Sequence, residues 1–315
     1  MDIVTIGDGM ITFDPSTKGP LRFVQTFERK IGGAELNVML GCARLGLNSG
    51  WISRLGKDEF GRHIFNEVRG EGVDVSEVKL MPGYATSLNF KEIQETGDGR
   101  TFYYRLPSPT ETLTPETLPF EYIKNAKIIH LTGVFCAIME QNRAITMRAL
   151  EWAKENGVIV SFDPNIRLRL WTAEEARETL LTYLPYVDHL LTSREELELL
   201  FETKDENELI NKLASYQFES VVMKDGAEGA FALIEGSWKH VPGVHVAKVV
   251  DTVGAGDGFD SGYLYGLLKG WPIEERLTFA NAIGAMVVQV HGDNEGLPYL
   301  EEVEQFLGKR EILVR

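Results

Sequence analysis

The sequence predicts an α/β fold built on a doubly wound, mostly parallel sheet, and three observations support this prediction. Short apolar runs alternate along the chain with amphipathic helical segments. Such alternation is typical of a parallel sheet that is covered by helices on both faces. The length of 315 residues, 43% of them hydrophobic, is enough for one large domain with a buried core. No repeat, low-complexity tract or obvious linker divides the chain.

The expected strands of this sheet are short apolar runs, the first of which lies at the N-terminus. They comprise residues 3–6, 127–131, 158–162, 189–191, 220–223 and 230–233. Amphipathic segments with helical spacing lie between most of them, for example 143–155, 173–184 and 194–201.

Two stretches break this alternation and predict a second, smaller sheet. Residues 11–31 are polar and irregular, whereas residues 84–105 alternate with a period of two around the hairpin-turn sequence Thr96-Gly-Asp-Gly99. Strands without intervening helices do not fit naturally inside a parallel sheet, so we expect a small antiparallel β lid over an active site. A surface hairpin without a function is the alternative. The predicted division is an α/β domain of residues 1–10, 32–83 and 106–315 and a lid of residues 11–31 and 84–105.

Composition excludes several classes of protein. Thirty-two Lys and Arg against 47 Asp and Glu give a net charge of −15, and no basic block is present, which argues against binding to nucleic acid or to an anionic membrane. No apolar run approaches the roughly 20 residues of a membrane span, and the N-terminus lacks the basic region of a signal peptide. Cys42 and Cys136 fit small core residues of a reducing compartment, so we expect a cytoplasmic protein.

A glycine turn near the C-terminus carries the chemistry. Gly254 and Gly256 precede a predicted helix over residues 259–269, and such a turn gathers unpaired amides where the helix dipole is positive. Asp257 lies in this turn, where the dipole favours its ionised form, so it is suited to act as a base beside a phosphate. An ordinary helix cap is the alternative role for Asp257. The chain contains no P-loop sequence Gly-x-x-x-x-Gly-Lys-Ser/Thr.

Two sequence signatures resemble those of the ribokinase-like (PfkB) carbohydrate kinases. Asp251-Thr-Val-Gly-Ala-Gly-Asp-Gly-Phe259 is similar to the C-terminal signature of that family, and Gly32-Gly-Ala-Glu-Leu-Asn37 begins a segment similar to the N-terminal one. The two lie about 220 residues apart in the expected order, and the resemblance extends over essentially the whole chain. It implies a ribokinase-like fold and an ATP-dependent sugar kinase that uses Mg²⁺, and it leaves open a requirement for a monovalent cation.

The resemblance also implies roles for individual residues. Asp257 would be the catalytic base, and Gly254, Ala255 and Gly256 would form the anion hole. Asp8, Gly32, Gly33 and Asn37 would contact the sugar, with a helix cap as the alternative for Asn37. Lys224, Gly226, Gly229 and Asn281 would bind the nucleotide, although Lys224 could instead be solvated and Asn281 could be an ordinary helix residue. Glu196 would handle Mg²⁺ indirectly, because Ser193 replaces the Asn of the usual Asn-x-x-Glu motif.

The choice of sugar rests on a few side chains. Arg105 and Arg167 are planar, bidentate donors that suit the carboxylate of a sugar acid. Asp293 in Gly292-Asp-Asn-Glu-Gly-Leu-Pro298 is assigned to the substrate by resemblance to 2-keto-3-deoxygluconate kinases. Tyr103 on the predicted lid is also assigned to the substrate, and in a nucleoside kinase it could stack on the base. The strings Arg105-Leu-Pro-Ser108 and 165–171 resemble fructokinases instead.

The sequence therefore predicts transfer of the γ-phosphate of ATP to the primary C6 hydroxyl of a ketose or keto-sugar acid. We slightly favour 2-keto-3-deoxygluconate over fructose as the acceptor. A nucleoside kinase and a non-catalytic sugar sensor are the further alternatives. We expect the exposed strand edges of the lid to pair in a homodimer.

Overall fold

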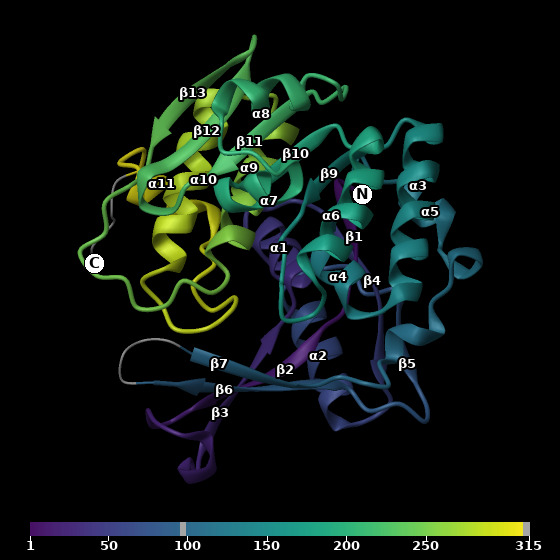
Figure 1. Ribbon diagram of the computed structural model, residues 1–315. Coiled ribbons are helices and arrows are strands. Elements are labelled where there is room, and N and C mark those ends of the chain that lie inside the picture. Colours follow the sequence, from purple (N-terminus) through teal and green to yellow (C-terminus); the bar gives the residue numbers. More distant parts are fainter. Residues whose placement is uncertain (95–98, 311–315) are drawn as a thin grey trace.

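Two sheets make up the protein, in a computed structural model that describes residues 1–94 and 99–310 (Figure 1). In this described part, nine strands form the larger sheet in the order β13-β12-β11-β10-β9-β8-β1-β4-β5. All neighbours from β11 to β5 are parallel, whereas β12 and β13 join antiparallel at one edge. The predicted doubly wound, mostly parallel sheet is confirmed.

The strands of the larger sheet are short. Their bounds are β1 Ile3–Ile6, β4 Ser49–Gly56, β5 Val78–Met81, β8 Ile128–Thr132, β9 Ile159–Asp163, β10 His189–Ser193, β11 Ser220–Lys224, β12 Gly229–Ile234 and β13 Ser237–Pro242. Successive side chains of a strand point to opposite faces, and both faces are buried here. In β1, for example, Ile3 packs into the core on one face while Val4 and Ile6 pack into the core on the other.

Helices cover both faces of this sheet (Figure 1). One face is covered by α1 Ala34–Arg44, α2 Glu59–Gly70, α9 Ala255–Leu268, α10 Ile273–Val287 and α11 Leu300–Phe306. The other is covered by α3 Phe120–Lys124, α4 Gly133–Ile138, α5 Glu140–Asn156, α6 Ala173–Tyr183, α7 Arg194–Phe201 and α8 Glu206–Leu213. Cys42 and Cys136 are both buried and free, each within one of these two cores.

The sequence did not predict every feature of the larger sheet. Strand β4 reads Ser-Gly-Trp-Ile-Ser-Arg-Leu-Gly, so polar and small residues interrupt its apolar pattern, yet all eight residues are buried. Arg54 is accommodated there because its guanidinium donates to the carbonyl of Ser53 at 2.8 Å. The predicted strand at 230–233 does form, as part of β12, but it runs antiparallel to β11.

The smaller sheet contains β3 Phe27–Gly32, β2 Met10–Pro15, β6 Ser87–Ile93 and β7 Gly99–Tyr104, in that spatial order. Residues 11–31, which have an irregular sequence, do contribute to the predicted small sheet, because β2 and β3 pair antiparallel there. The sheet is also not wholly antiparallel, since β2 and β6 are parallel. Strands β6 and β7 form the expected hairpin, while three residues of the predicted turn, 96–98, lie outside the described residues.

The smaller sheet lies beside the larger one, below it in Figure 1. Strand β2 follows β1 after only the residues Gly7, Asp8 and Gly9, so the chain passes from the carboxyl end of a central strand directly into the smaller sheet. Among residues 1–94 and 99–310, no helix has both the length and the apolar character needed to cross a membrane.

Candidate active site

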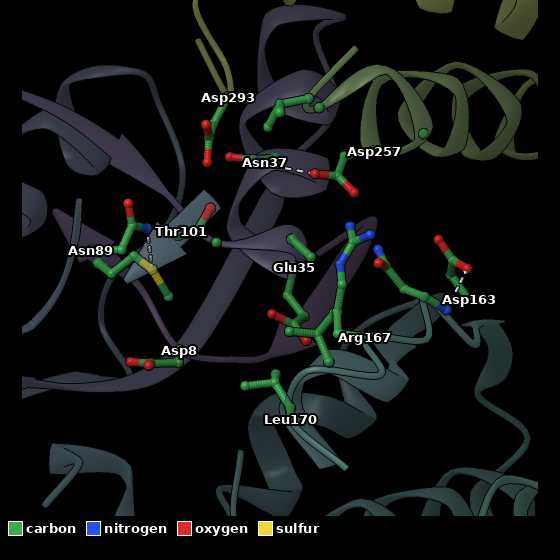
Figure 2. A pocket seen from close by; sticks show the side chains of 18 of the residues that line it. Asp8, Glu35, Asn37, Asn89, Thr101, Asp163, Arg167, Leu170, Asp257 and Asp293 are labelled. Carbon is green, nitrogen blue, oxygen red and sulfur yellow. Dashed lines mark hydrogen bonds between the residues drawn. The ribbon is translucent and has the colours of Figure 1, made fainter. Parts of the chain in front are cut away.

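A cleft of about 560 Å³ lies where the two sheets meet (Figure 2). The larger sheet supplies Asp8 just after β1, Asp163 at the end of β9 and Lys224 at the end of β11. These are carboxyl ends of parallel strands, the edge at which open α/β sheets bind ligands. The smaller sheet supplies alternate residues of β6 and β7, which share one face because side chains alternate along a strand. The lining residues from these two strands are Asn89, Lys91, Thr101 and Tyr103.

Helix α9 begins at the cleft with a tight glycine turn. It starts at Ala255, four residues earlier than predicted, so Gly256 and Asp257 lie in its first turn. Gly254 is the N-cap with φ +77°, a conformation that favours glycine. A Cβ atom at Gly254 would overlap the backbone carbonyl oxygen of Asp293, so the turn packs directly on the neighbouring loop. The first amides of a helix have no intrahelical acceptor and can face an anion.

Asp257 is buried and held by a partner distant in sequence. The Asn37 side-chain amide donates to Asp257 Oδ2 at 2.8 Å, as Figure 2 shows. Burial raises the pKa of Asp257 to about 6, although the bond from Asn37 and the charge of Arg167 oppose this rise. Burial thus opposes the ionised form of Asp257 that the start of a helix favours, because a carboxylate removed from water loses its hydration.

The start of α1 brings the N-terminal signature into the same cleft. Gly33 is the N-cap of α1, and Asn37 lies inside the helix, so the capping alternative for Asn37 is wrong. Gly33 has φ +149°, and a Cβ atom there would come within 2.5 Å of the Asp8 carbonyl oxygen. This close approach requires glycine at position 33.

Asp8 and Arg105 face each other across the cleft, 3.4 Å apart, and both are buried. The Arg105 guanidinium also lies 5.0 Å from the centre of the Tyr103 ring. Within the described part of the chain, three buried atoms at this end have no hydrogen-bond partner: Asp8 Oδ1, Arg105 Nε and Asn89 Oδ1. Unpaired buried polar atoms are costly, so a cleft with both donors and acceptors left over is suited to a polar ligand such as a polyol.

Lys224 lies at the opposite end of the cleft and is not solvated. Its ammonium contacts Asp163 Oδ2 at 2.9 Å and Asp260 Oδ1 at 3.0 Å. These carboxylates hold the pKa of Lys224 above its ordinary value although burial opposes this. A Cβ atom at Gly256 would lie 3.8 Å from Lys224 Nζ, so the charge is next to the first turn of α9. Arg167, an exposed residue of the lining, adds a second cation near Asp257.

Glu35 is a lining residue that sequence reasoning did not single out. It is buried at the start of α1, and its Oε1 accepts hydrogen bonds from Thr132 Oγ1 and from the Phe135 amide. Burial raises its pKa to about 7, and the nearby Asp257 and Asp8 contribute to the rise. Its position in Gly32-Gly-Ala-Glu35, next to the two glycines, was the available signal.

Five of the predicted site residues do not line this cleft: Gly32, Ala255, Gly226, Gly229 and Asn281. Gly32 lies behind Asp293, whose carboxylate would overlap a Cβ atom at that position. The Ala255 amide donates to the Thr252 carbonyl at 3.3 Å. Asn281 donates to the carbonyls of Val241 and Pro242, both at 3.1 Å, and so joins α10 to the end of β13.

Glu196 lines the cleft, but its carboxylate is already engaged. Oε1 accepts from the Ile166 amide at 2.7 Å, and Oε2 accepts from the Ser193 amide at 2.9 Å. Ser193 and Glu196 form a capping box at the start of α7, which explains a Ser at this position. Among residues 1–94 and 99–310, no group of three or more His, Cys, Asp or Glu side chains is arranged to hold a metal ion.

Comparison with known proteins identifies the family. Residues 1–300 match the pfkB family of carbohydrate kinases. The chain belongs to this family. It is therefore a carbohydrate kinase with a ribokinase-like fold, as the two signatures predicted, and Asp257 and Gly254 lie in the C-terminal signature.

Similar proteins cover nearly the whole kinase. A 2-dehydro-3-deoxygluconokinase of Bacillus subtilis (strain 168) is 36% identical over 309 residues, which are 98% of this chain and 95% of that protein. A probable chloroplastic fructokinase of Arabidopsis thaliana is 36% identical over 318 residues, covering 98% and 82%. The crystal structure of a candidate ribokinase II from E. coli in complex with ATP and Mg²⁺ is 27% identical, with a TM-score of 0.89 and coverage of 98% and 99%.

Proposed function

We propose that this kinase transfers the γ-phosphate of ATP to the C6 hydroxyl of 2-keto-3-deoxygluconate. The observation that carries the proposal is the arrangement around Asp257: a buried carboxyl in the first turn of α9, between a polar acceptor end and the cation Lys224. Asp257 would accept the hydroxyl proton while the amides at the start of α9 face the transferring phosphoryl group.

Three further groups would support this step. Asn37 fixes the Asp257 carboxylate through a 2.8 Å hydrogen bond, which favours the ionised form that can accept a proton. Lys224, with one N–H left beyond its two aspartate contacts, would bind an oxygen of the phosphoryl group. The exposed guanidinium of Arg167 would serve either the phosphoryl group or the acceptor carboxylate.

The nucleotide would be ATP, which the similar E. coli kinase binds together with Mg²⁺. When bound, Mg²⁺ neutralises charge on the phosphate oxygens. The donor set fits a metal held mainly by the nucleotide, because both oxygens of Glu196 are engaged and this residue would act only through water. A dependence on a monovalent cation stays a prediction.

The keto acid is favoured over fructose by charge and by similarity. Lys91, Arg105, Arg167 and Arg169 are cations in the lining, and a carboxylate acceptor would use them more fully than a neutral ketose. The Bacillus subtilis relative acts on the dehydrodeoxygluconate by its name. Fructose stays the second candidate because a probable fructokinase is equally identical.

The test is ADP release by the full chain with Mg-ATP, comparing 2-keto-3-deoxygluconate with fructose at equal concentrations. We expect the larger kcat/KM for the keto acid. A larger value for fructose would make the protein a fructokinase. No turnover with either sugar would overturn both assignments, and the acceptor search would turn to nucleosides, or to a sugar sensor if none is phosphorylated.

We also propose a homodimer formed through the smaller sheet. Strand β7 is an edge of this sheet in the described structure, and its Phe102 and Tyr104 are exposed. An exposed edge strand with large apolar side chains is commonly covered by a second chain. Closure of this sheet over the cleft would exclude water from the reaction.

A further inference from the structure

One cation of the cleft lining belongs to the smaller sheet, and the proposed function gives it no specific contact with the acceptor. Lys91 lies on β6, two residues beyond Asn89 and paired across the hairpin with Thr101. All three line the cleft, as expected for one face of a strand pair. The side chain of Lys91 is only 14% exposed, so its charge is directed into the cleft rather than into bulk water.

The contacts of Lys91 join the smaller sheet to the loop before α11. Its ammonium contacts Asp293 Oδ1 at 2.6 Å and Asp14 Oδ1 at 3.3 Å. A lysine ammonium has three N–H donors, so two carboxylates leave one donor for a ligand.

A neighbouring lysine shows what a purely structural role looks like here. Lys30 on β3 lies 3.4 Å from the other oxygen of Asp14 and donates to the His291 carbonyl at 2.9 Å. It therefore ties the same sheet to the same loop, and it is even more buried, at 6% exposure. Lys30 does not line the cleft, whereas Lys91 does.

Lys91 lies on the side of the cleft where the C1 end of the acceptor would be. In Figure 2, Asn89 and Asp293 lie on one side of the cleft and Asp163, a partner of Lys224, lies on the other, with Asp257 between them. The C6 hydroxyl of a six-carbon acceptor must face Asp257 and the phosphoryl group. Its C1 end is the far end of the carbon chain, and it would extend to the side of Asn89 and Asp293, away from Lys224.

We infer that Lys91 is a specificity-determining residue that recognises the C1 carboxylate of the acceptor, with Asp293 and Asp14 holding its ammonium in place. This inference rests on the proposed function, because it assigns the group that distinguishes a keto acid from a neutral ketose. Arg105, which follows β7, also pairs with a carboxylate, so pairing does not distinguish it from Lys91; the two cations differ in place, because Arg105 lies beside Asp8 and Lys91 lies beside Asp293. Lys91 thus gives the site a charge that a sugar without a carboxylate cannot use.

Two acceptors that differ in one group test this inference. 2-Keto-3-deoxygluconate and 3-deoxyfructose share their carbon chain, and the second carries CH₂OH in place of the C1 carboxylate. The measured quantity is the ratio of kcat/KM values for the two acceptors with saturating Mg-ATP. The proteins are the wild type, Lys91→Met, Lys91→Arg and Lys30→Met, each checked for its melting temperature.

We expect Lys91→Met to lower the ratio about tenfold to a hundredfold, mainly through KM for the keto acid, because charge-assisted contacts have about that value. Lys91→Arg should recover most of the ratio by restoring the charge. Lys30→Met should reduce the melting temperature at least as much as Lys91→Met while leaving the ratio unchanged. An equal loss of activity toward both acceptors in Lys91→Met would overturn the inference and leave the proposed function standing. If the wild-type protein does not phosphorylate the keto acid, both the inference and the proposed function are overturned.

Discussion

The carboxyl group of Asp257 combines burial with a position beside a developing negative charge. If it accepts the hydroxyl proton, Asp257→Asn should fold and bind ATP but lose about 10²- to 10⁴-fold in kcat, the usual contribution of a general base. The change is nearly isosteric, and the Asn37 side chain can still find an acceptor oxygen at position 257. Steady-state kinetics together with ATP titration would check this. Retention of more than a tenth of kcat would remove Asp257 from the role of base.

The same residue predicts a pH dependence of activity. Because Asp257 must be ionised to accept a proton and burial raises its pKa to about 6, kcat/KM should fall about tenfold per pH unit below pH 6. Of the charged groups near Asp257, Asp163 raises its pKa while Arg167 and Lys224 lower it, and the charge of Asp257 in turn raises the pKa of Glu35. A profile of kcat/KM between pH 4.5 and 8.5 measures this decrease. A constant rate down to pH 4.5 would contradict the assignment.

Glu35 should make folding stability depend on pH. Its pKa is about 7 in the folded protein and 4.5 as an ordinary value, so the unfolded chain ionises this group first. Stability from Glu35 is therefore fully present below pH 4.5, falls as the pH rises to about 7, and is then constant, with a total on the order of 3 kcal/mol. Glu35→Gln removes this titration, so its melting temperature relative to wild type should rise from pH 5 to pH 8. An identical difference at both pH values would show that Glu35 is not the titrating group.

At the scale of the element, α9 depends on how its first turn is built. Gly254→Ala meets two obstacles: a left-handed φ, which costs roughly 1–2 kcal/mol with a Cβ atom, and overlap with the Asp293 carbonyl. The overlap must move either the Asp293 loop or the turn that carries Asp257. We therefore expect Gly254→Ala to lose at least tenfold in kcat as well as stability.

Gly270 at the other end of α9 is the matched control for this prediction. It has φ +70°, but a Cβ atom there meets nothing within 4 Å. Gly270→Ala should lose a similar amount of stability through backbone strain, and it should keep the wild-type kcat. Thermal denaturation and kinetics of both variants would check the pair. Equal losses of kcat would show that the contact with Asp293 has no part in catalysis.

The elements themselves differ in how far the sequence predicted them. Strands β1, β8, β9, β10 and β11 were predicted within one or two residues because continuous apolar runs mark strands buried on both faces. Strand β4 was missed because Arg54 and four other polar or small residues hide its burial. Strands β2 and β3 were not predicted individually within the lid, because the polar segment between them interrupts the pattern and because their pairing with each other and with β6 is a tertiary contact.

At the scale of the whole molecule, the smaller sheet predicts an assembly. If two chains pair through β7, the mass in solution should be twice 35.3 kDa, and Tyr104→Lys should shift it toward a single chain. Tyr104 is 63% exposed, so the monomer should tolerate the charge. Light scattering coupled to size-exclusion chromatography measures this. A wild-type mass of 35 kDa at micromolar concentration would contradict the dimer.

The sequence alone determined the class of fold and the place of the phosphoryl-transfer chemistry. The period of apolar residues and the turn chemistry of Gly254-Ala-Gly-Asp257 are local properties of the chain, so a single sequence is enough to reveal them. Tertiary structure decided how the site is charged and paired. Asn37 meets Asp257 across 220 residues, and Lys91 meets Asp293 across 202, so neither contact leaves a local signal. Burial then raises the pKa of Asp257 and Glu35, because a carboxylate removed from water loses the hydration that stabilises its charge.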